Sequence, residues 1–195
     1  NFNQQEQVSS KLIFSEIVCA LALNKKGGHF VLKIFDIYTS LTVKILFILN
    51  HFYEEMYIVK PNTSRPANSE KYVVCKHFRG IEQKVFENII GILYAWNKID
   101  YRKKGYVVDI EGLPFRASYG ISLQKYNAYL AKIQIEHILK TLAILQNRPN
   151  QEDIRWIRSK QYVYAIAWCK KYNLQYNQKL LTCPDDTVKH SSVGL

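Results

Sequence analysis

The chain has 195 residues, of which 48% are hydrophobic and 22% are charged, and its formal net charge is +11. These proportions are ordinary for one globular domain, and no low-complexity tract interrupts the chain. A strongly basic exterior attracts nucleic acid, or an anionic membrane surface, through electrostatics that do not depend on sequence. The longest apolar run, LTVKILFILNHF, is too short to span a bilayer, so we expect a soluble protein and no membrane partner.

The first 76 residues alternate between helical and extended patterns. Apolar residues in QVSSKLIFSEIVCALAL recur at helical spacing, and NKKGG separates them from the short apolar run HFVLKIF. The elements expected in this part are helix 7–23, strand 29–35, helix 41–52 capped by Thr39 or Ser40, strand 55–60 and strand 71–76. This alternation is typical of an α/β sheet.

The last two strands of this part are joined by a loop that contains no helix. A parallel pair would need a long crossover connection, so strands 55–60 and 71–76 should be antiparallel. The loop between them, 61–69, is polar and longer than the two to five residues that a hairpin turn usually needs. Its length suggests a role beyond reversing the chain.

Beyond residue 80 the strand pattern fades and helical patterns dominate. Helical segments are predicted near 80–98, 121–146 and 151–173. We therefore expect two parts, with the sheet in residues 1–80 and a mostly helical extension, packed on it, in residues 81–195.

Lys33 is unusual because it places an ammonium in the middle of an apolar strand, where desolvation is costly. It could reach an edge and extend its amine into water, or it could be held at the carboxyl end of a strand, where open α/β sheets bind ligands. If strand 71–76 lies antiparallel beside strand 29–35, Glu70 meets Lys33 at that edge. Alternatively, Glu70 is a surface partner of Lys60 or Lys71.

Two stretches carry a resemblance to a known family. GGHFVLKIFD and KPNTSRPANSEKYVVCK, with the preceding helix, resemble the second half of FtsJ-type ribose 2′-O-methyltransferases, and most of all the cap-specific mRNA enzymes. The match runs from about residue 5 to 78, and weaker similarity continues through ISLQKYNAYLAKIQIEHILKTLAIL. The resemblance implies that residues 1–80 are the second half of a Rossmann-like methyltransferase sheet ending in an antiparallel strand pair, followed by the helical extension 81–195.

The resemblance also implies a catalytic tetrad of Lys, Asp, Lys and Glu, with S-adenosylmethionine as the methyl donor. Lys33 matches the second lysine and Glu70 matches the glutamate. In the family, the first lysine, the aspartate and the glycine-rich cofactor loop lie upstream, and none of them is present in these 195 residues. We therefore expect a carboxyl-terminal portion that leaves most cofactor binding to upstream residues and is inactive by itself.

The long loop is a candidate RNA-binding segment. Lysine, arginine and serine side chains can bind phosphate oxygens, and asparagine amides can bind sugar or phosphate. The loop residues predicted to contact RNA are Lys60, Asn62, Ser64, Arg65 and Asn68. Pro61 and Pro66 stiffen the loop and lower its ordering cost on binding. The alternative is a plain hairpin loop with a capping arginine.

The function expected from this resemblance is 2′-O-methylation of capped mRNA at the first transcribed nucleotide. The alternatives are a ribosomal or other RNA 2′-O-methyltransferase, or a non-catalytic RNA-binding subunit. Capped RNA is the expected partner, with RNA polymerase II or other capping machinery as further candidates. The expected location is the nucleus, with the cytoplasm as the alternative.

Other candidate sites are weaker. The cysteines at 19, 75, 169 and 183 and the histidines lack metal-ligand spacing, so we predict reduced thiols and no bound metal. His29 should pack or cap near the glycines. The basic run Tyr101–Lys104 could form an accessory RNA surface, although a solvated charge run is the simpler interpretation.

Overall fold

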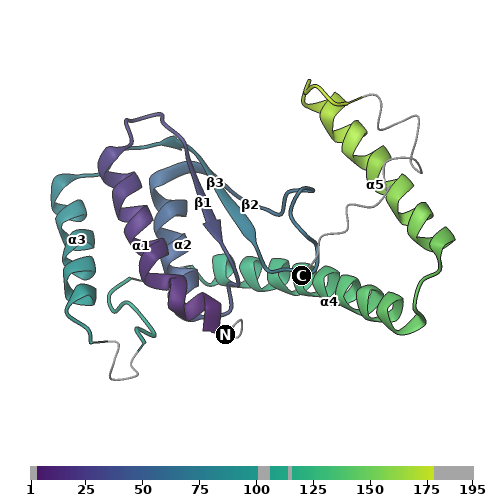
Figure 1. Cartoon of the computed structure of the whole chain (residues 1–195). Helices are drawn as coiled ribbons and strands as arrows, with labels where there is room; N and C mark the ends of the chain where they lie inside the picture. Colours follow the sequence, from purple (N-terminus) through teal and green to yellow (C-terminus); the bar gives the residue numbers. More distant parts are fainter. Residues whose placement is uncertain (1–3, 101–105, 114–115, 178–195) are drawn as a thin grey trace. The chain divides into compact units, whose positions relative to one another are not determined.

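The computed structural model describes residues 4–100, 106–113 and 116–177. These residues form a mixed α/β structure (Figure 1). The elements are α1 Gln5–Leu23, β1 Phe30–Ile34, α2 Ser40–Phe52, β2 Tyr53–Val59, β3 Lys71–Phe78, α3 Gln83–Asn97, α4 Ala117–Asn147 and α5 Gln151–Lys171. The chain divides into two compact units, Asn1–Ile138 and Leu139–Leu195, and α4 runs through the boundary between them.

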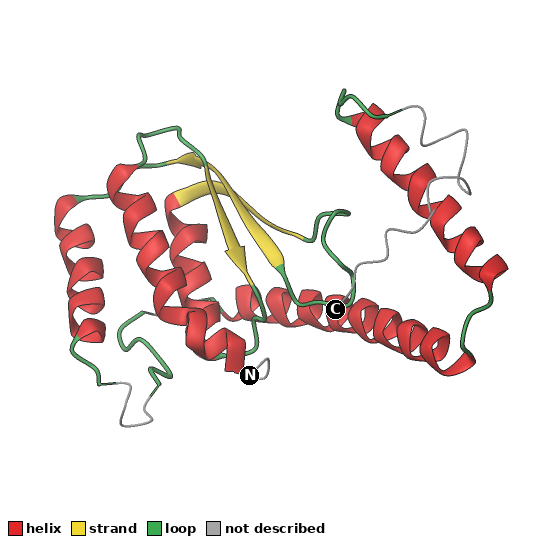
Figure 2. Ribbon diagram, in the orientation of Figure 1, coloured by secondary structure: helices red, strands yellow, loops and turns green. Residues whose placement is uncertain are grey.

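The first unit contains a three-stranded sheet in the order β1-β3-β2, drawn in yellow in Figure 2. Both pairings are antiparallel, with Lys33 and Val59 each opposite Tyr72 on the central strand. The predicted antiparallel pairing of 55–60 with 71–76 is therefore confirmed, although β2 begins earlier, at Tyr53, directly after α2. The mixed α/β class is likewise confirmed.

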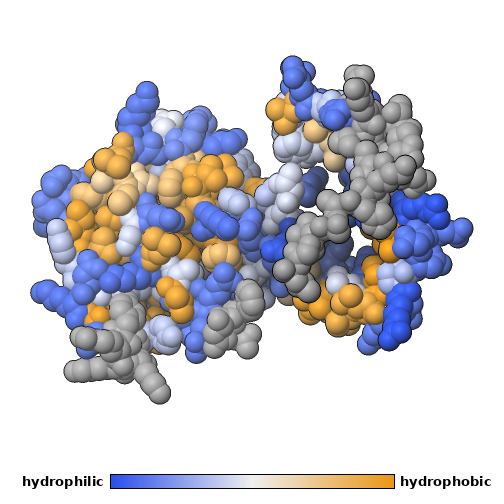
Figure 3. All heavy atoms as spheres, in the orientation of Figure 1, coloured by the Kyte–Doolittle hydropathy of each residue, from blue (hydrophilic) through white to orange (hydrophobic). Residues whose placement is uncertain are grey.

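One face of this sheet is buried and the other is exposed. Leu32, Ile34, Val73 and Cys75 alternate along β1 and β3 and point into a core that they share with α1 and α2. The intervening side chains point the other way, and Val31 is among the exposed ones. Figure 3 shows hydrophobic side chains, in orange, among polar ones at the surface of this unit.

The start of α2 is fixed by its cap and by a carboxylate from α1. Thr39 Oγ1 accepts a hydrogen bond from Thr42 N at 3.2 Å, which confirms the predicted cap. Glu6 Oε1 accepts from Thr39 N at 2.9 Å and from Tyr38 N at 3.0 Å. The amino-terminal ends of α1 and α2 are thus joined beside the end of β1.

The predicted helices after residue 80 appear as α3, α4 and α5. In the second unit, α5 begins with a capping box in which Asn150 and Asp153 each accept the other's backbone N–H. The packing of an extension 81–195 on a sheet domain 1–80 stays a prediction. Within the described ranges, no helix combines the length and apolar character that crossing a bilayer requires.

We expect Phe14→Ala to lower the free energy of unfolding by about 3–5 kcal/mol, because it empties a buried ring-sized volume. Phe14 is fully buried, and its ring lies 5.4 Å from that of Trp96 on α3. The matched control is Leu12→Ala, two residues away on the same helix and 61% exposed, which should change stability by less than about 0.5 kcal/mol. Urea titrations followed by tryptophan fluorescence compare the variants. Equal effects of the two substitutions would mean that Phe14 is not buried in solution.

Candidate active site

Antiparallel pairing brings Lys33 and Glu70 together at one edge of the sheet. The end of β1 lies beside the start of β3, and Lys33 Nζ is 2.9 Å from Glu70 Oε2. The predicted meeting of these two side chains is therefore confirmed. Lys33 lies on the exposed face, between the inward-pointing Leu32 and Ile34, and its side chain is 49% exposed. Its ammonium therefore avoids the desolvation cost that the apolar sequence context suggested.

Tyr72 is a third member of this cluster that sequence reasoning missed. Its hydroxyl donates to Glu70 Oε1 at 3.0 Å, so the two carboxylate oxygens have different partners. Tyr72 lies directly opposite Lys33 in the β1–β3 register. Strand alternation in KYVVC was the available signal, since it places Tyr72 on the same face as Lys33 once the register is known.

The three side chains shift one another's pKa values in consistent directions. The hydrogen bond to Glu70 raises the pKa of Lys33, despite a smaller opposing effect of burial. The hydrogen bond from Lys33, followed by that from Tyr72, lowers the pKa of Glu70. At neutral pH the pair is therefore an ammonium and a carboxylate, which suits stabilisation of negative charge more than abstraction of a proton.

The long loop between β2 and β3 consists of two consecutive turns. Ser64 N donates to Pro61 O at 2.9 Å, and Asn68 N donates to Arg65 O at 3.2 Å. Pro66 occupies the second position of the later turn, where its fixed φ is favoured. The sequence therefore builds a folded loop that ends at Glu70.

The predicted RNA-contacting residues of this loop divide into two sets. Lys60, Ser64 and Asn68 are half-buried and hydrogen-bond one another. Asn62 and Arg65 are exposed, and the Arg65 guanidinium has no hydrogen bond or ion pair with the described residues. The two exposed side chains are thus the ones free to contact a ligand.

Lys71, the residue after Glu70, is a buried lysine that ties the loop to β1. Its Nζ donates to Phe35 O at 3.0 Å and Ser69 O at 2.9 Å, and lies 3.8 Å from Asp36 Oδ1. Burial, the largest effect, lowers the pKa of Lys71. These contacts hold the backbone on both sides of the Lys33–Glu70 pair.

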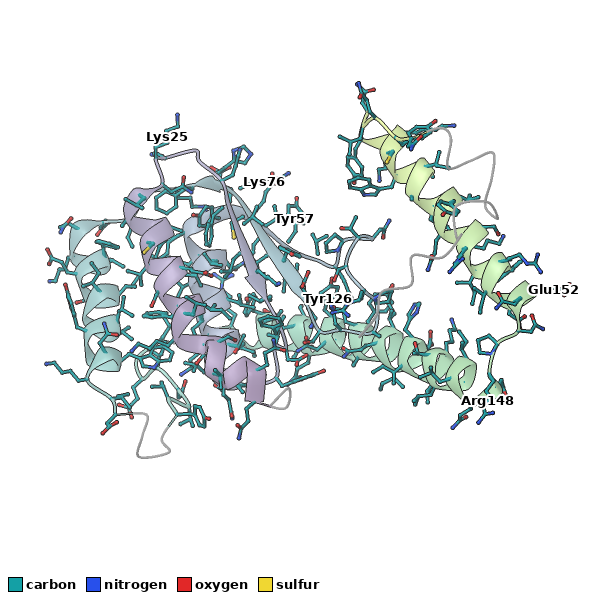
Figure 4. The ribbon with its side chains drawn as sticks, in the orientation of Figure 1. Lys25, Tyr57, Lys76, Tyr126, Arg148 and Glu152 are labelled. Carbon is teal, nitrogen blue, oxygen red and sulfur yellow. The ribbon has the colours of Figure 1, made fainter. Side chains whose placement is uncertain are left out.

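The first part of α4 braces the same end of the sheet. Tyr126 OH donates to Ile58 O at 2.8 Å, and the Asn127 side-chain amide donates to Ile37 O. Ile58 lies near the end of β2, and Ile37 follows β1. Figure 4 labels Tyr126 at this end, whereas Lys25 lies at the opposite end of the sheet. One helix therefore fixes the ends of both strands that lead to the candidate site.

The other candidates lie elsewhere or are unsuited to catalysis. His29, at the opposite end of β1, accepts a hydrogen bond from His77 N through Nδ1 at 3.2 Å. Burial raises the pKa of Cys75 to about 12, so its thiol is not a nucleophile at neutral pH. The basic run 101–104 and Cys183 lie outside the described residues.

Comparison with known proteins identifies the relatives of this site. Residues 1–78, which include β1, β3, Lys33 and Glu70, match the model of the FtsJ-like methyltransferase family. Residues 1–78 are thus similar to the FtsJ-like methyltransferases. The resemblance predicted from the two sequence stretches is therefore confirmed.

The chain is also similar to proteins named cap-specific mRNA (nucleoside-2′-O-)-methyltransferase 1. It is 31% identical to the one from Trypanosoma brucei brucei over 153 residues, which cover 78% of this chain and 41% of the relative. It is 30% identical to the Homo sapiens protein over 159 residues, or 78% of this chain and 19% of the relative. The zebrafish (Danio rerio) protein is 45% identical over 96 residues, or 49% of this chain and 12% of the relative. The chain thus spans less than half the length of each of these relatives.

We expect Tyr72→Phe to raise the pKa of Glu70 towards its ordinary value, because one hydrogen bond to the carboxylate is lost. Lys33→Met should raise it further, since the Lys33 hydrogen bond is the larger cause. Carboxyl ¹³C NMR titration of Glu70 measures both shifts.

The internal control for this titration is Glu55. Its pKa is lowered first by the hydrogen bond from Tyr57 and then, more weakly, by Lys76. It should titrate unchanged in both variants. An unchanged Glu70 pKa in Tyr72→Phe would mean that the hydroxyl does not bind the carboxylate in solution.

Proposed function

We propose that this chain supplies the Lys–Glu half of the active site of a Rossmann-like RNA ribose 2′-O-methyltransferase that acts on the first transcribed nucleotide of capped mRNA. The observation that carries the proposal is the Lys33–Glu70 pair at the sheet edge, in a segment that matches the FtsJ-like family. Relatives named as cap-specific mRNA methyltransferases support the choice of substrate. Capping machinery and a nuclear location are part of the same proposal.

Lys33 is suited to the electrostatic part of this reaction. A ribose hydroxyl is a poor acid, and a fixed cation near it stabilises the alkoxide that develops during transfer. Glu70 raises the pKa of Lys33 and so keeps the ammonium charged. Lys33 therefore steers the hydroxyl and stabilises its negative charge, while Glu70 and Tyr72 orient Lys33.

The family's cofactor, S-adenosylmethionine, supplies the methyl group as a sulfonium when bound. The glycine-containing turn between α1 and β1 does not form a cradle for it. The adjacent glycines 27 and 28 close the turn between α1 and β1, where an added Cβ on Gly28 would meet Asn24 Oδ1 at 2.2 Å. That atom belongs to the protein's own turn, so this turn offers no open cradle, and we assign cofactor binding to residues outside this sequence.

The RNA is held, in this proposal, by the exposed part of the loop. Arg65 and Asn62 are exposed in the loop that ends at Glu70, and backbone phosphates are the groups that such side chains bind without reading sequence. This places the ribose near Lys33 and leaves selection of the cap to other parts of the enzyme.

We expect Lys33→Ala to abolish methyl transfer while leaving RNA binding nearly unchanged, because the cation acts mainly on the reacting hydroxyl. The assay uses the longest natural form of the protein with matched capped and uncapped RNAs, followed by analysis of the first transcribed nucleotide. Lys76→Ala is the matched control, because Lys76 is also an exposed strand lysine paired with a glutamate, Glu55, at 3.4 Å (Figure 4).

Three results would oppose the proposal in different ways. Methyl transfer by Lys33→Ala would show that Lys33 is not needed to stabilise the reacting hydroxyl. Transfer to capped and uncapped RNA alike would indicate a general RNA methyltransferase. RNA binding without any transfer by the longest form would indicate a non-catalytic RNA-binding subunit.

We expect Arg65→Ala to weaken RNA binding. The plot of log K, the logarithm of the association constant, against log[salt] should also become shallower by about 0.7, because one phosphate contact with a single strand is lost. Binding of a capped oligonucleotide at several salt concentrations measures the slope. Lys25→Ala removes another exposed cation, at the opposite end of the sheet, and should leave the slope unchanged. Equal slopes for wild type and Arg65→Ala would make Arg65 a structural residue.

A further inference from the structure

The ammonium of Lys60 is occupied by the loop that follows it. Its Nζ lies 2.8 Å from Asn68 O, 2.8 Å from Asn68 Oδ1, 2.9 Å from Glu70 O and 3.3 Å from Ser64 Oγ. An ammonium has three protons to donate, so these oxygens account for its full hydrogen-bonding capacity. Lys60 therefore faces the interior of the loop and has no proton left for an RNA phosphate.

Asn68 links this contact to the backbone of Glu70. Its Oδ1 accepts hydrogen bonds from Lys60 and, at 3.2 Å, from Glu70 N. Lys60 itself binds Glu70 O. Both polar groups of the Glu70 peptide backbone are therefore held, one by Asn68 and one by Lys60.

Holding this backbone also fixes the carboxylate that it carries. The Glu70 side chain must reach Lys33 on one side and Tyr72 on the other, at 2.9 and 3.0 Å. A small rotation of the Glu70 backbone would break one of these contacts. The position of the carboxylate thus depends on an ammonium at the other end of the loop.

We propose that Lys60 is a positioning residue, which closes loop 60–70 from within and thereby fixes Glu70, and that it does not bind RNA. The closed loop also presents Arg65 before RNA arrives, which lowers the ordering cost of binding. Burial lowers the pKa of Lys60 more than the Glu70 carboxylate raises it, as expected for an ammonium turned away from water. The catalytic consequence rests on the proposed function, whereas the closed loop does not.

The closed loop is tested first by amide hydrogen exchange of the free chain. In Lys60→Met, exchange at the amides of Ser64, Asn68 and Glu70 should accelerate about tenfold, since the loop loses its central donor. Asn68→Ala should do the same, and the double variant should differ little from either single variant, because both remove one network. Lys25→Met, an exposed lysine elsewhere, is the control and should exchange as wild type.

Two results of this experiment would overturn the closed loop. One is wild-type exchange in Lys60→Met. The other is a double variant whose effect equals the product of the two single effects, because that would make Lys60 and Asn68 independent.

The division of roles between Lys60 and Arg65 is tested by RNA binding. Lys60→Met should keep the wild-type salt slope, whereas Arg65→Ala should reduce it. A slope reduced by about 0.7 in Lys60→Met would show a direct phosphate contact and overturn the proposal. If the wild-type protein binds no RNA, the proposed function fails, and the exchange experiment alone decides the role of Lys60 in the loop.

The positioning of Glu70 is tested by methyl transfer in the longest natural form of the protein. Lys60→Met should lower kcat about tenfold or more with little change in KM, because a small misplacement of a catalytic group is costly. A raised KM with unchanged kcat would instead indicate RNA binding. The NMR pKa of Glu70 should also move towards its ordinary value in this variant, partly because the charge of Lys60 itself lowers that pKa.

Discussion

The insertion of β3 antiparallel between β1 and β2 is the constraint on which the candidate site depends. It places the first residues of β3 beside the last residues of β1, so Glu70 lies 2.9 Å from Lys33 although the two are far apart in sequence. The same arrangement puts the β2–β3 loop at that edge. A parallel neighbour would have carried the loop and Glu70 to the opposite end of the sheet.

Strand alternation then separates the stabilising residues from the reactive ones. Leu32 and Ile34 enter the core, and Lys33 between them stays on the open face. Tyr72 lies between the buried Lys71 and Val73 and joins the same face. A shift of one residue in register would bury Lys33 and expose its neighbours, so the hydrophobic core itself fixes the position of the pair.

The sequence predicted the elements and the meeting of Lys33 with Glu70, because hydrophobic periodicity and strand direction are local or topological properties. It did not reveal Tyr72 or Lys71, whose partners depend on cross-strand register and on backbone carbonyls that leave no trace in a residue pattern. Lys60 illustrates the same limit. Sequence grouped it with Arg65 as an RNA contact, but only the turn geometry shows which of the two cations faces inward.

The net charge of +11 therefore overstates the charge available to RNA near the site. Lys33 is paired with Glu70, and Lys71 is buried among carbonyls beside Asp36. Lys60 is enclosed by its own loop, whereas Arg65 is exposed. The internal lysines hold the loop and the Glu70 carboxylate in place, and only exposed cations such as Arg65 remain to bind RNA. Because the loop is already folded before RNA binds, the free energy of those contacts contributes to binding and orienting the RNA and does not have to offset the cost of ordering the loop.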